Sequence, residues 1–207
     1  HVSPDGRNGA LVEVNCETDF VAKDAAFVQF ARAVAQVAGE RRITEPAALS
    51  QEKLPGGESV DAARQALVSK LGENMTVRRV VTIEAKGRLA SYLHGTRIGV
   101  LVDYSGGDEA LGKDLAMHIA ASKPVARSRD EVSTELGERE RTIARARAVE
   151  SGRPEILLDK MVEGAVNKYL SEVTLLGQPF VKDDKQTVEK LLVARGATVH
   201  AFQMFVL

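Results

Sequence analysis

The chain has 207 residues, of which 44% are hydrophobic and 28% charged, enough for one large domain or two small ones with a buried core. Its formal net charge is −1, whereas proteins whose main partner is a nucleic-acid backbone usually carry a basic excess. A single cysteine, Cys16, excludes an intramolecular disulfide and a cysteine-based metal site, and no apolar run is long enough to span a bilayer. We expect a protein of the reducing cytoplasm, although a compartment derived from bacteria would give the same composition.

The first half of the chain alternates between strand and helix patterns. Apolar and polar residues alternate over 10–16, which predicts a strand. From Asp24 onward apolar residues recur every three or four positions, which predicts an amphipathic helix capped by Asp24 or by the pair Thr18 and Asp19. Further predicted elements are a helix at 58–71 with Gly72 as its C′ residue, a strand at 76–85, two strands divided near Gly95, and a helix that stops before Pro124.

The second half begins with two long helical patterns, 133–150 and 154–173, on either side of a short break. Pro154 fits the first position of the second helix, and the short break predicts an antiparallel hairpin. One apolar stripe is predicted along the second helix, formed by Leu158, Met161, Val162, Ala165, Tyr169 and Val173. After the hairpin come the segment QPFV, a helix at 187–196 and a strand at 197–207.

A loose internal repeat relates the two halves. NGALVEVNCETDFVAKDAAFVQFARAVAQVA compares with RIGVLVDYSGGDEALGKDLAMHIAA, and ALVSKLGENMTVRRVVTIE compares with KLLVARGATVHAFQMFVL. The expected fold class is therefore α+β, with two related subdomains of strands and helices and a helical hairpin inserted in the second. The expected boundaries are 1–95 for the first subdomain, 96–133 with 174–207 for the second, and 134–173 for the hairpin.

Catalytic and cofactor motifs are missing from the sequence, which has no HExxH, GxGxxG or GxSxG pattern and no phosphate-loop spacing. We therefore expect no enzyme activity, no cofactor and no metal site. Cys16 is expected to be a structural thiol in a buried strand rather than a nucleophile. His94, beside Gly95, fits either a polar residue satisfied within the fold or a residue at a close contact with another surface. The arginines of 139–147 alternate with glutamates, which favours a solvated helix face over a nucleic-acid patch.

An aromatic residue, Phe20, lies at the polar junction between the first strand and the first helix, in a chain that is only 4% aromatic. The residues alone leave two interpretations open. Phe20 can be tucked under the helix as a hydrophobic staple, with Asp19 as the cap. Alternatively, it can be an exposed aromatic on a tight turn, which is how a rigid scaffold presents a binding hot spot.

Six blocks of the sequence resemble the translation elongation factor Ts family, in the order in which that family carries them. The blocks are VNCETDFVAKDAAF, KLGENMTVRRV, YLHGTRIGVLV, LAMHIAASKP, GRPEILLDKMVEG and LLGQPFV. Together they extend over nearly the whole chain. A small N-terminal helical module and a segment after the last strand, both typical of the family, are missing from the sequence, so we expect a core fragment.

The resemblance implies a guanine-nucleotide exchange factor that binds elongation factor Tu in its nucleotide-free or GDP form. Such a factor displaces Mg²⁺ and promotes GDP release so that GTP can bind. The resemblance also implies the family's fold, which has two related α+β subdomains, each with a small antiparallel sheet packed with helices, and a helical coiled-coil hairpin inserted in the second. This fold agrees with the repeat. Neither a membrane nor a nucleic acid is expected as a direct partner. A dimer formed through the helical hairpin is an alternative that the sequence does not decide.

The family's working residues are assigned to this sequence one by one. The Thr-Asp-Phe-Val motif, which in the family enters the G domain of elongation factor Tu and displaces Mg²⁺, falls on Thr18, Asp19, Phe20 and Val21. Further partner contacts fall on Leu71, Gly72, His94 and Val181. Three positions depart from the family's pattern, namely Ala165, Met204 and Val206. The resemblance favours the exposed interpretation of Phe20.

Two other functions stay open. One is an assembly protein that oligomerises through the hairpin and exchanges no nucleotide, and the other is an RNA-binding protein that uses helix 139–147. Exchange predicts a complex with elongation factor Tu that GDP dissociates, which neither alternative predicts.

Overall fold

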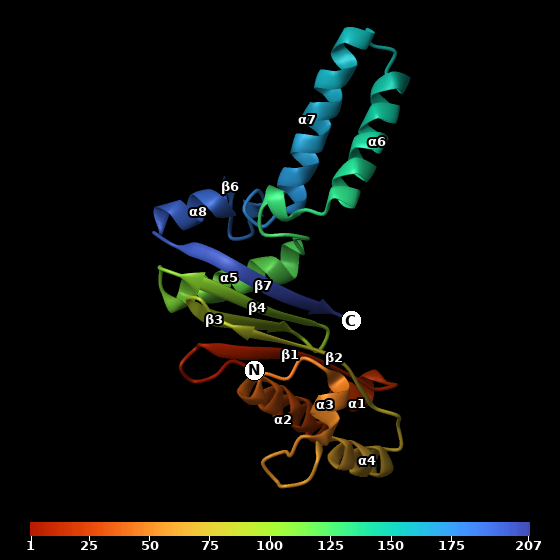
Figure 1. The fold of residues 1–207 in the computed structure, drawn as a ribbon, viewed down its shortest axis with the longest axis vertical. Helices are drawn as coiled ribbons and strands as arrows, with labels where there is room; N and C mark the ends of the chain where they lie inside the picture. The colour runs from red at the N-terminus through yellow and green to blue at the C-terminus, as the bar shows by residue number, and fades with distance from the viewer. The chain divides into compact units, whose positions relative to one another are not determined.

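The computed structural model describes the whole chain, residues 1–207, and shows two compact units. Unit 1 comprises His1–Ala120 and Ala197–Leu207, and unit 2 comprises Ala121–Gly196. Helices and small antiparallel sheets are mixed along the chain, which confirms the predicted α+β class (Figure 1). The predicted division into two subdomains and a hairpin was based on a sequence repeat, whereas the two units are defined by contacts between residues. The predicted division therefore stays a prediction.

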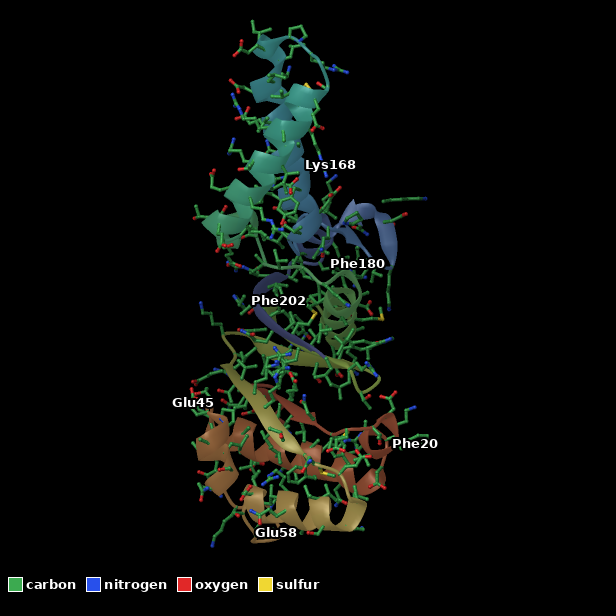
Figure 2. All side chains as sticks on the ribbon, turned by 90° about the vertical axis from the view of Figure 1, so that its right-hand side faces the viewer. Phe20, Glu45, Glu58, Lys168, Phe180 and Phe202 are labelled. Atoms are coloured by element: carbon green, nitrogen blue, oxygen red, sulfur yellow. The ribbon has the colours of Figure 1, made fainter.

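Unit 1 contains two sheets and the helices that cover them. Its elements are β1 (Asn8–Asn15), α1 (Asp19–Ala22), α2 (Ala25–Arg41), α3 (Pro46–Gln51), α4 (Val60–Leu71), β2 (Thr76–Glu84), β3 (Arg88–His94), β4 (Ile98–Ser105), most of α5 (Glu109–Ser122) and β7 (Thr198–Val206). β1 pairs antiparallel with β2, and β4 lies between β3 and β7, also antiparallel. β1 contacts α2 on one side and strands β4 and β7 on the other (Figures 1 and 2).

The two long strand pairs share a detail that supports an internal duplication. In the repeated segments ALVEVN and VLVDYS, Glu13 corresponds to Asp103, and both carboxylates are buried. The register shifts directly after each of them, between Glu13 and Val14 in β1 and between Asp103 and Tyr104 in β4. Each copy of the repeat therefore carries a buried acid beside a shift in strand register, which agrees with the predicted duplication.

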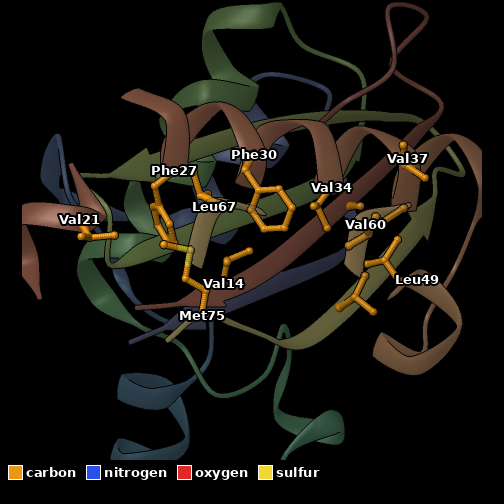
Figure 3. Packing of buried hydrophobic residues seen from close by; sticks show 13 residues of the cluster. Val14, Val21, Phe27, Phe30, Val34, Val37, Leu49, Val60, Leu67 and Met75 are labelled. Atoms are coloured by element: carbon orange, nitrogen blue, oxygen red, sulfur yellow. The ribbon is translucent and has the colours of Figure 1, made fainter. Parts of the chain in front are cut away.

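One hydrophobic core of unit 1 lies between α2, α4 and the β1–β2 pair (Figure 3). Apolar residues of α2 recur at helical spacing, so one face of the helix can be buried against the sheet. The buried members of this cluster are Ala10, Val14, Val21, Phe27, Phe30, Val34, Val37, Ala38, Leu49, Val60, Leu67, Met75 and Val80. One of them, Val21, comes from the short helix α1, which is thereby fixed to the core.

A buried carboxylate joins the strands of unit 1. Glu13 on β1 forms ion pairs with Arg78, at 3.0 Å, and with Arg79. Burial alone would raise the pKa of the Glu13 carboxyl, but the hydrogen bonds from Arg79 and Arg78 outweigh burial and hold that pKa below its ordinary value. Arg79 also donates to the carbonyl oxygen of Val206, at 3.2 Å, and lies over the Phe205 ring. The acid therefore fastens β1, β2 and β7 to one another.

Unit 2 contains a helical hairpin and a small hairpin of strands. Its elements are the 3₁₀ helix η1 (Arg129–Glu131), α6 (Thr134–Glu150), α7 (Glu155–Val173), β5 (Pro179–Phe180), β6 (Asp183–Thr187) and α8 (Val188–Ala194). α6 and α7 lie side by side in opposite directions (Figure 1), as predicted. Their buried seam is formed by Ala144, Ala148, Val162 and Val166, with Leu158, Met161 and Leu170 packed against it.

Several local predictions need correction. Ala165 is exposed, and the next residue, Val166, lies in the seam in its place. Pro154 is the N-cap of α7 rather than its first helical residue. Cys16 lies just beyond the end of β1 and is half-buried, not inside a buried strand. The short elements α1, α3 and β6 were not predicted as separate elements.

Across the chain, every helix is either too short or too polar to cross a membrane.

Candidate functional site

A tight corner in the chain places the Thr-Asp-Phe-Val segment at the start of α1. Thr18 has extended backbone angles, and its hydroxyl oxygen accepts a hydrogen bond from the N–H of Val21 at 3.3 Å. Asp24 then caps α2 by accepting from the N–H of Ala26 at 2.8 Å and from that of Phe27 at 3.3 Å. Of the two caps proposed for the amphipathic helix, Asp24 is therefore the one observed. Thr18 instead caps the separate short helix α1, and Asp19 is the first residue of that helix.

Neighbouring residues of this corner point in opposite directions. Val21 is 8% exposed and belongs to the core cluster of unit 1 (Figure 3). Phe20 is 89% exposed, the highest value among the large exposed apolar side chains, and lies at the surface (Figure 2). The staple interpretation is therefore wrong for Phe20, and an aromatic ring is displayed on a turn whose next residue is anchored.

The turn is held from a second segment by Glu73. The β1–β2 ladder ends where Asn15 faces Thr76, so the chain that leaves β1 lies beside the chain that enters β2. One carboxylate oxygen of Glu73 accepts hydrogen bonds from the backbone N–H of Glu17, at 3.1 Å, and of Thr18, at 3.0 Å. The other oxygen accepts from the Thr18 hydroxyl. The carboxylate therefore fixes both main chain and side chain at the N-cap of α1.

The predicted contacts Leu71 and Gly72 directly precede Glu73 in the chain. Gly72 is the left-handed C-cap of α4, with φ +74°, and its N–H donates to the carbonyl of Val68 at 2.8 Å. An added Cβ at Gly72 would have no neighbouring atom within 4 Å. Leu71 is half-buried and packs against the core. Gly72 is therefore an open, side-chain-free surface next to the Phe20 turn, although any larger residue would be strained in this conformation.

The turn between β3 and β4 reaches the same corner. Arg97 donates to the Asp19 carboxylate at 3.0 Å, and its backbone N–H donates to the carbonyl of His94 at 3.4 Å. His94 is exposed, and its ring lies 6.3 Å from that of Tyr92, whose hydroxyl is 3.4 Å from Nδ1. Asp19 and Arg97 are also well exposed, so their ion pair is solvated.

Seven of the eight predicted residues thus come from three segments of unit 1, of which the Thr18–Val21 turn is hydrogen-bonded to each of the other two. The eighth, Val181, lies in unit 2. Val181 directly follows β5 and is 47% exposed. Sequence reasoning did not single out Glu73 or Arg97. No local pattern pairs them with Thr18 and Asp19, which precede them by 55 and 78 residues.

The thiol of Cys16 lies next to this site but is poorly suited to nucleophilic chemistry. Its Sγ donates to the carbonyl of Thr18 at 3.4 Å. Burial raises the pKa of the Cys16 thiol, and the negative charges of Glu73 and Asp19 raise it further. The thiol is therefore protonated at neutral pH, whereas a reactive cysteine needs a lowered pKa. No group of three or more histidine, cysteine, aspartate or glutamate side chains could hold a metal ion.

Comparison with known proteins gives a consistent result. A family model described as Elongation factor TS matches residues 17–207, a range that includes every residue of the site. The chain is 58% identical over 205 residues to Elongation factor Ts of Nitrosomonas eutropha, covering 99% of this chain and 70% of that protein. It is 54% identical over 209 residues to Elongation factor Ts of Nitrosospira multiformis, and 56% identical over 207 residues to that of Azoarcus sp., in each case covering 100% of this chain and 69% of the relative.

Proposed function

Because the chain belongs to the elongation factor Ts family and so has a role in translation elongation, we propose that it is a guanine-nucleotide exchange factor for elongation factor Tu. In this proposal it binds the GDP form, displaces Mg²⁺, promotes GDP release and leaves a nucleotide-free complex that GTP resolves. The observation that carries the proposal is Phe20, an 89% exposed ring on a turn that is anchored to the core and bonded to two other loops.

Exchange changes an equilibrium and makes no covalent bond. A GTPase holds its nucleotide with backbone amides, a lysine and a Mg²⁺ ion that bridges phosphate oxygens. An exchange protein that binds the nucleotide-free form more tightly than the GDP form must weaken GDP binding. The fold-change is the same as that by which GDP weakens binding of the exchange protein. Typical couplings of about 1–3 kcal/mol give roughly five- to 150-fold effects, so strong exchange needs several contacts that act together.

Phe20 is proposed to act as a wedge. A phenylalanine ring buries a large apolar area when it enters a pocket, and an aromatic anchor on a rigid support loses little conformational entropy on binding. Because packed protein interiors switch between discrete arrangements, a ring inserted between helices of the partner can convert a small displacement into a rearrangement of the Mg²⁺ and phosphate sites. Asp19 adds negative charge near a site that has lost a cation, moderated by its ion pair with Arg97.

The remaining predicted residues are proposed to seat the partner. Leu71, Gly72 and His94 form the surface around the Phe20 turn, and Gly72 allows close approach because it has no side chain. Val181, half exposed on unit 2, is proposed as part of a second contact area. A translation factor of this kind is proposed to act in the cytoplasm, or in an organelle of bacterial origin.

The proposal is tested by mixing the purified chain with elongation factor Tu that carries a fluorescent GDP analogue. Stopped-flow fluorescence should show GDP release accelerated by at least about tenfold. Size-exclusion chromatography should show a complex that added GDP dissociates. Unaccelerated release, with a chain that elutes only as its own oligomer, would contradict the proposal and favour an assembly protein.

The arginines of α6 do not favour a second, nucleic-acid-binding function. Arg145 lies 3.2 Å from Asp159 of α7, and Arg141 lies 3.9 Å from Glu138 of the same helix. Part of their charge is thus neutralised by neighbouring carboxylates, which weakens a phosphate-binding surface.

A further inference from the structure

We propose that Glu73 is a positioning residue that holds the Thr18–Val21 turn in the shape that displays Phe20, before any partner arrives. The consequence for nucleotide exchange rests on the proposed function, whereas the holding itself is a property of the free chain. Glu73 is not among the residues assigned from the family resemblance, and it carries the inference through its contacts alone.

A carboxylate suits this position because all three of its partners are donors. One oxygen of Glu73 accepts hydrogen bonds from the backbone N–H groups of Glu17 and Thr18, and the other accepts a hydrogen bond from the Thr18 hydroxyl. An ionised carboxylate offers only acceptors, on two oxygens, and hydrogen bonds to a charged acceptor are stronger than neutral ones. The Thr18 hydroxyl, once it has donated to Glu73, still accepts from the N–H of Val21. Glu73 therefore also orients the oxygen that caps α1.

The restraint is reciprocal across the two segments. Glu17 accepts from the backbone N–H of Asn74 at 3.2 Å and from its side-chain amide at 2.9 Å. Each segment thus supplies a glutamate that binds the backbone of the other, where the β1–β2 ladder stops. The paired loops extend the order of the strand pair to the base of the Phe20 turn.

Other restraints on the turn are insufficient by themselves. α1 has four residues, and a single helical turn is not stable alone because helix nucleation is unfavourable. Val21 anchors one side of the turn to the core. The Asp19–Arg97 pair holds the outer side, but both side chains are more than half exposed, and such pairs contribute little. Glu73 is half-buried and bonds to the main chain, so its loss should free the N-cap of α1.

In the proposed exchange reaction this restraint should affect the rate within the complex. The surrounding contacts can form an encounter with the partner whether or not the turn is ordered. Release of GDP then depends on the fraction of complexes in which the turn has the competent shape. Loss of Glu73 should therefore lower the rate at saturating factor. A variant that was merely partly unfolded would instead need a higher total concentration to reach the unchanged maximal rate.

The experiment compares Glu73→Ala and Glu73→Gln with a control, Glu84→Ala. A glutamine at 73 can still accept both backbone N–H groups on its oxygen and donate its amide to the Thr18 hydroxyl oxygen, so it preserves the geometry without the charge. Glu84 lies at the opposite end of the same strand pair, facing Asn8, and pairs with Arg42 at the surface. The control therefore removes one exposed carboxylate from β2 and leaves the turn intact.

Two readouts are taken on each variant. In the free chain, hydrogen exchange of the Thr18 and Val21 amides is followed by NMR. With elongation factor Tu, GDP release is measured by stopped flow over a range of factor concentrations that reaches saturation. Glu73→Ala should speed amide exchange and lower the saturating release rate by about tenfold, as expected when several hydrogen bonds that order a loop are lost. Glu73→Gln should retain most of the amide protection and most of the saturating release rate, and Glu84→Ala should match the wild type in both readouts.

The readouts separate failure of this inference from failure of the proposed function. A wild-type chain that does not accelerate GDP release removes the proposed function, and the amide exchange in the free chain then decides the role of Glu73. Unchanged amide exchange in Glu73→Ala overturns the inference. So does an unchanged saturating rate beside an active wild type, or an equal loss in Glu73→Ala and Glu73→Gln, since the last result would assign the effect to charge rather than geometry.

Discussion

Two apolar side chains of this protein are almost equally exposed, yet their surroundings differ. Phe20 in unit 1 is 89% exposed, and Ile156, near the tip of the α6–α7 hairpin in unit 2, is 88% exposed. The turn that carries Phe20 is bonded to residues 55 and 78 positions away in the sequence, through Glu73 and Arg97. Around Ile156, the connection between the helices is closed by backbone bonds between residues three or four positions apart.

The difference teaches that exposure alone does not identify a binding residue. Ile156 is the second residue of α7, in a first turn held only by contacts close in the sequence. A side chain on such a helix end still loses conformational freedom when it binds, and that loss opposes binding. A side chain on a turn that is already fixed by distant segments has lost that freedom during folding. In the proposed function Phe20, and not Ile156, is therefore the anchor. Substitutions in and around the Phe20 turn should separate the residues that hold the turn from the ring that it displays.

The largest effect on the free energy of unfolding is expected for Val21→Ala. Removing two buried methyl groups from the core cluster should cost about 2 kcal/mol. Phe20→Ala, one position away, should change stability by less than about 0.5 kcal/mol because the ring is exposed. Denaturant unfolding of both variants measures this. Equal losses would contradict the assignment of an inner and an outer face to the turn.

Glu13→Gln should come next, with a loss of about 1 kcal/mol at neutral pH, because its arginine partners remain partly in water. The folded-state pKa of Glu13 is lowered, so its contribution is present above the unfolded pKa of about 4.3 and is lost as the pH falls through the folded value. Wild type should therefore lose stability in acid more steeply than Glu13→Gln.

Urea unfolding of the wild type and of Glu13→Gln, measured between neutral pH and about pH 3, tests whether the charge of Glu13 stabilises the strands of unit 1. The two stabilities should converge toward the acid end of the range. A difference that stays constant with pH would show that Glu13 acts through packing and not through its charge.

A smaller effect is expected for Arg97→Ala, which removes the exposed partner of Asp19. Double-mutant cycles with Asp19→Asn should give a coupling energy below about 1 kcal/mol that falls further in high salt. A larger coupling that does not depend on salt would make this pair, and not Glu73, the main outer restraint on the turn.

The smallest effect is expected for Cys16→Ala, about 0.5 kcal/mol or less, with GDP release unchanged. The protonated thiol contributes only a weak bond to the Thr18 carbonyl. Slower GDP release from a fully stable Cys16→Ala variant would show that the thiol takes part in the reaction.

Local patterns in the sequence were sufficient to predict the parts of the fold that depend on near neighbours. The cap at Asp24, the left-handed Gly72 and the antiparallel hairpin each follow from residues within a few positions. The pairing of β1 with β2 and of β4 with β7 agrees with the repeat, since each pair joins its first and last strands. The residues around the Phe20 turn were predicted through the family resemblance and not from periodicity.

The remainder could not be predicted because it depends on distant contacts. Whether Phe20 or Val21 faces the core is decided by α2 and the β1–β2 pair together, not by the four residues of α1. The contacts of Glu73 and Arg97 join segments whose separation in the chain hides them from any local pattern. Helix and strand elements as short as α3 and β6 carry too few residues to show a period.

The most direct test of the account is stopped-flow release of a fluorescent GDP analogue from elongation factor Tu, with Phe20→Ala and Ile156→Ala measured in parallel at saturating concentration. Each variant loses one equally exposed apolar side chain. The account predicts that Phe20→Ala lowers the release rate by about 100-fold, a hot-spot effect of roughly 2–3 kcal/mol, while Ile156→Ala matches the wild type. Near-normal release with Phe20→Ala would contradict the account.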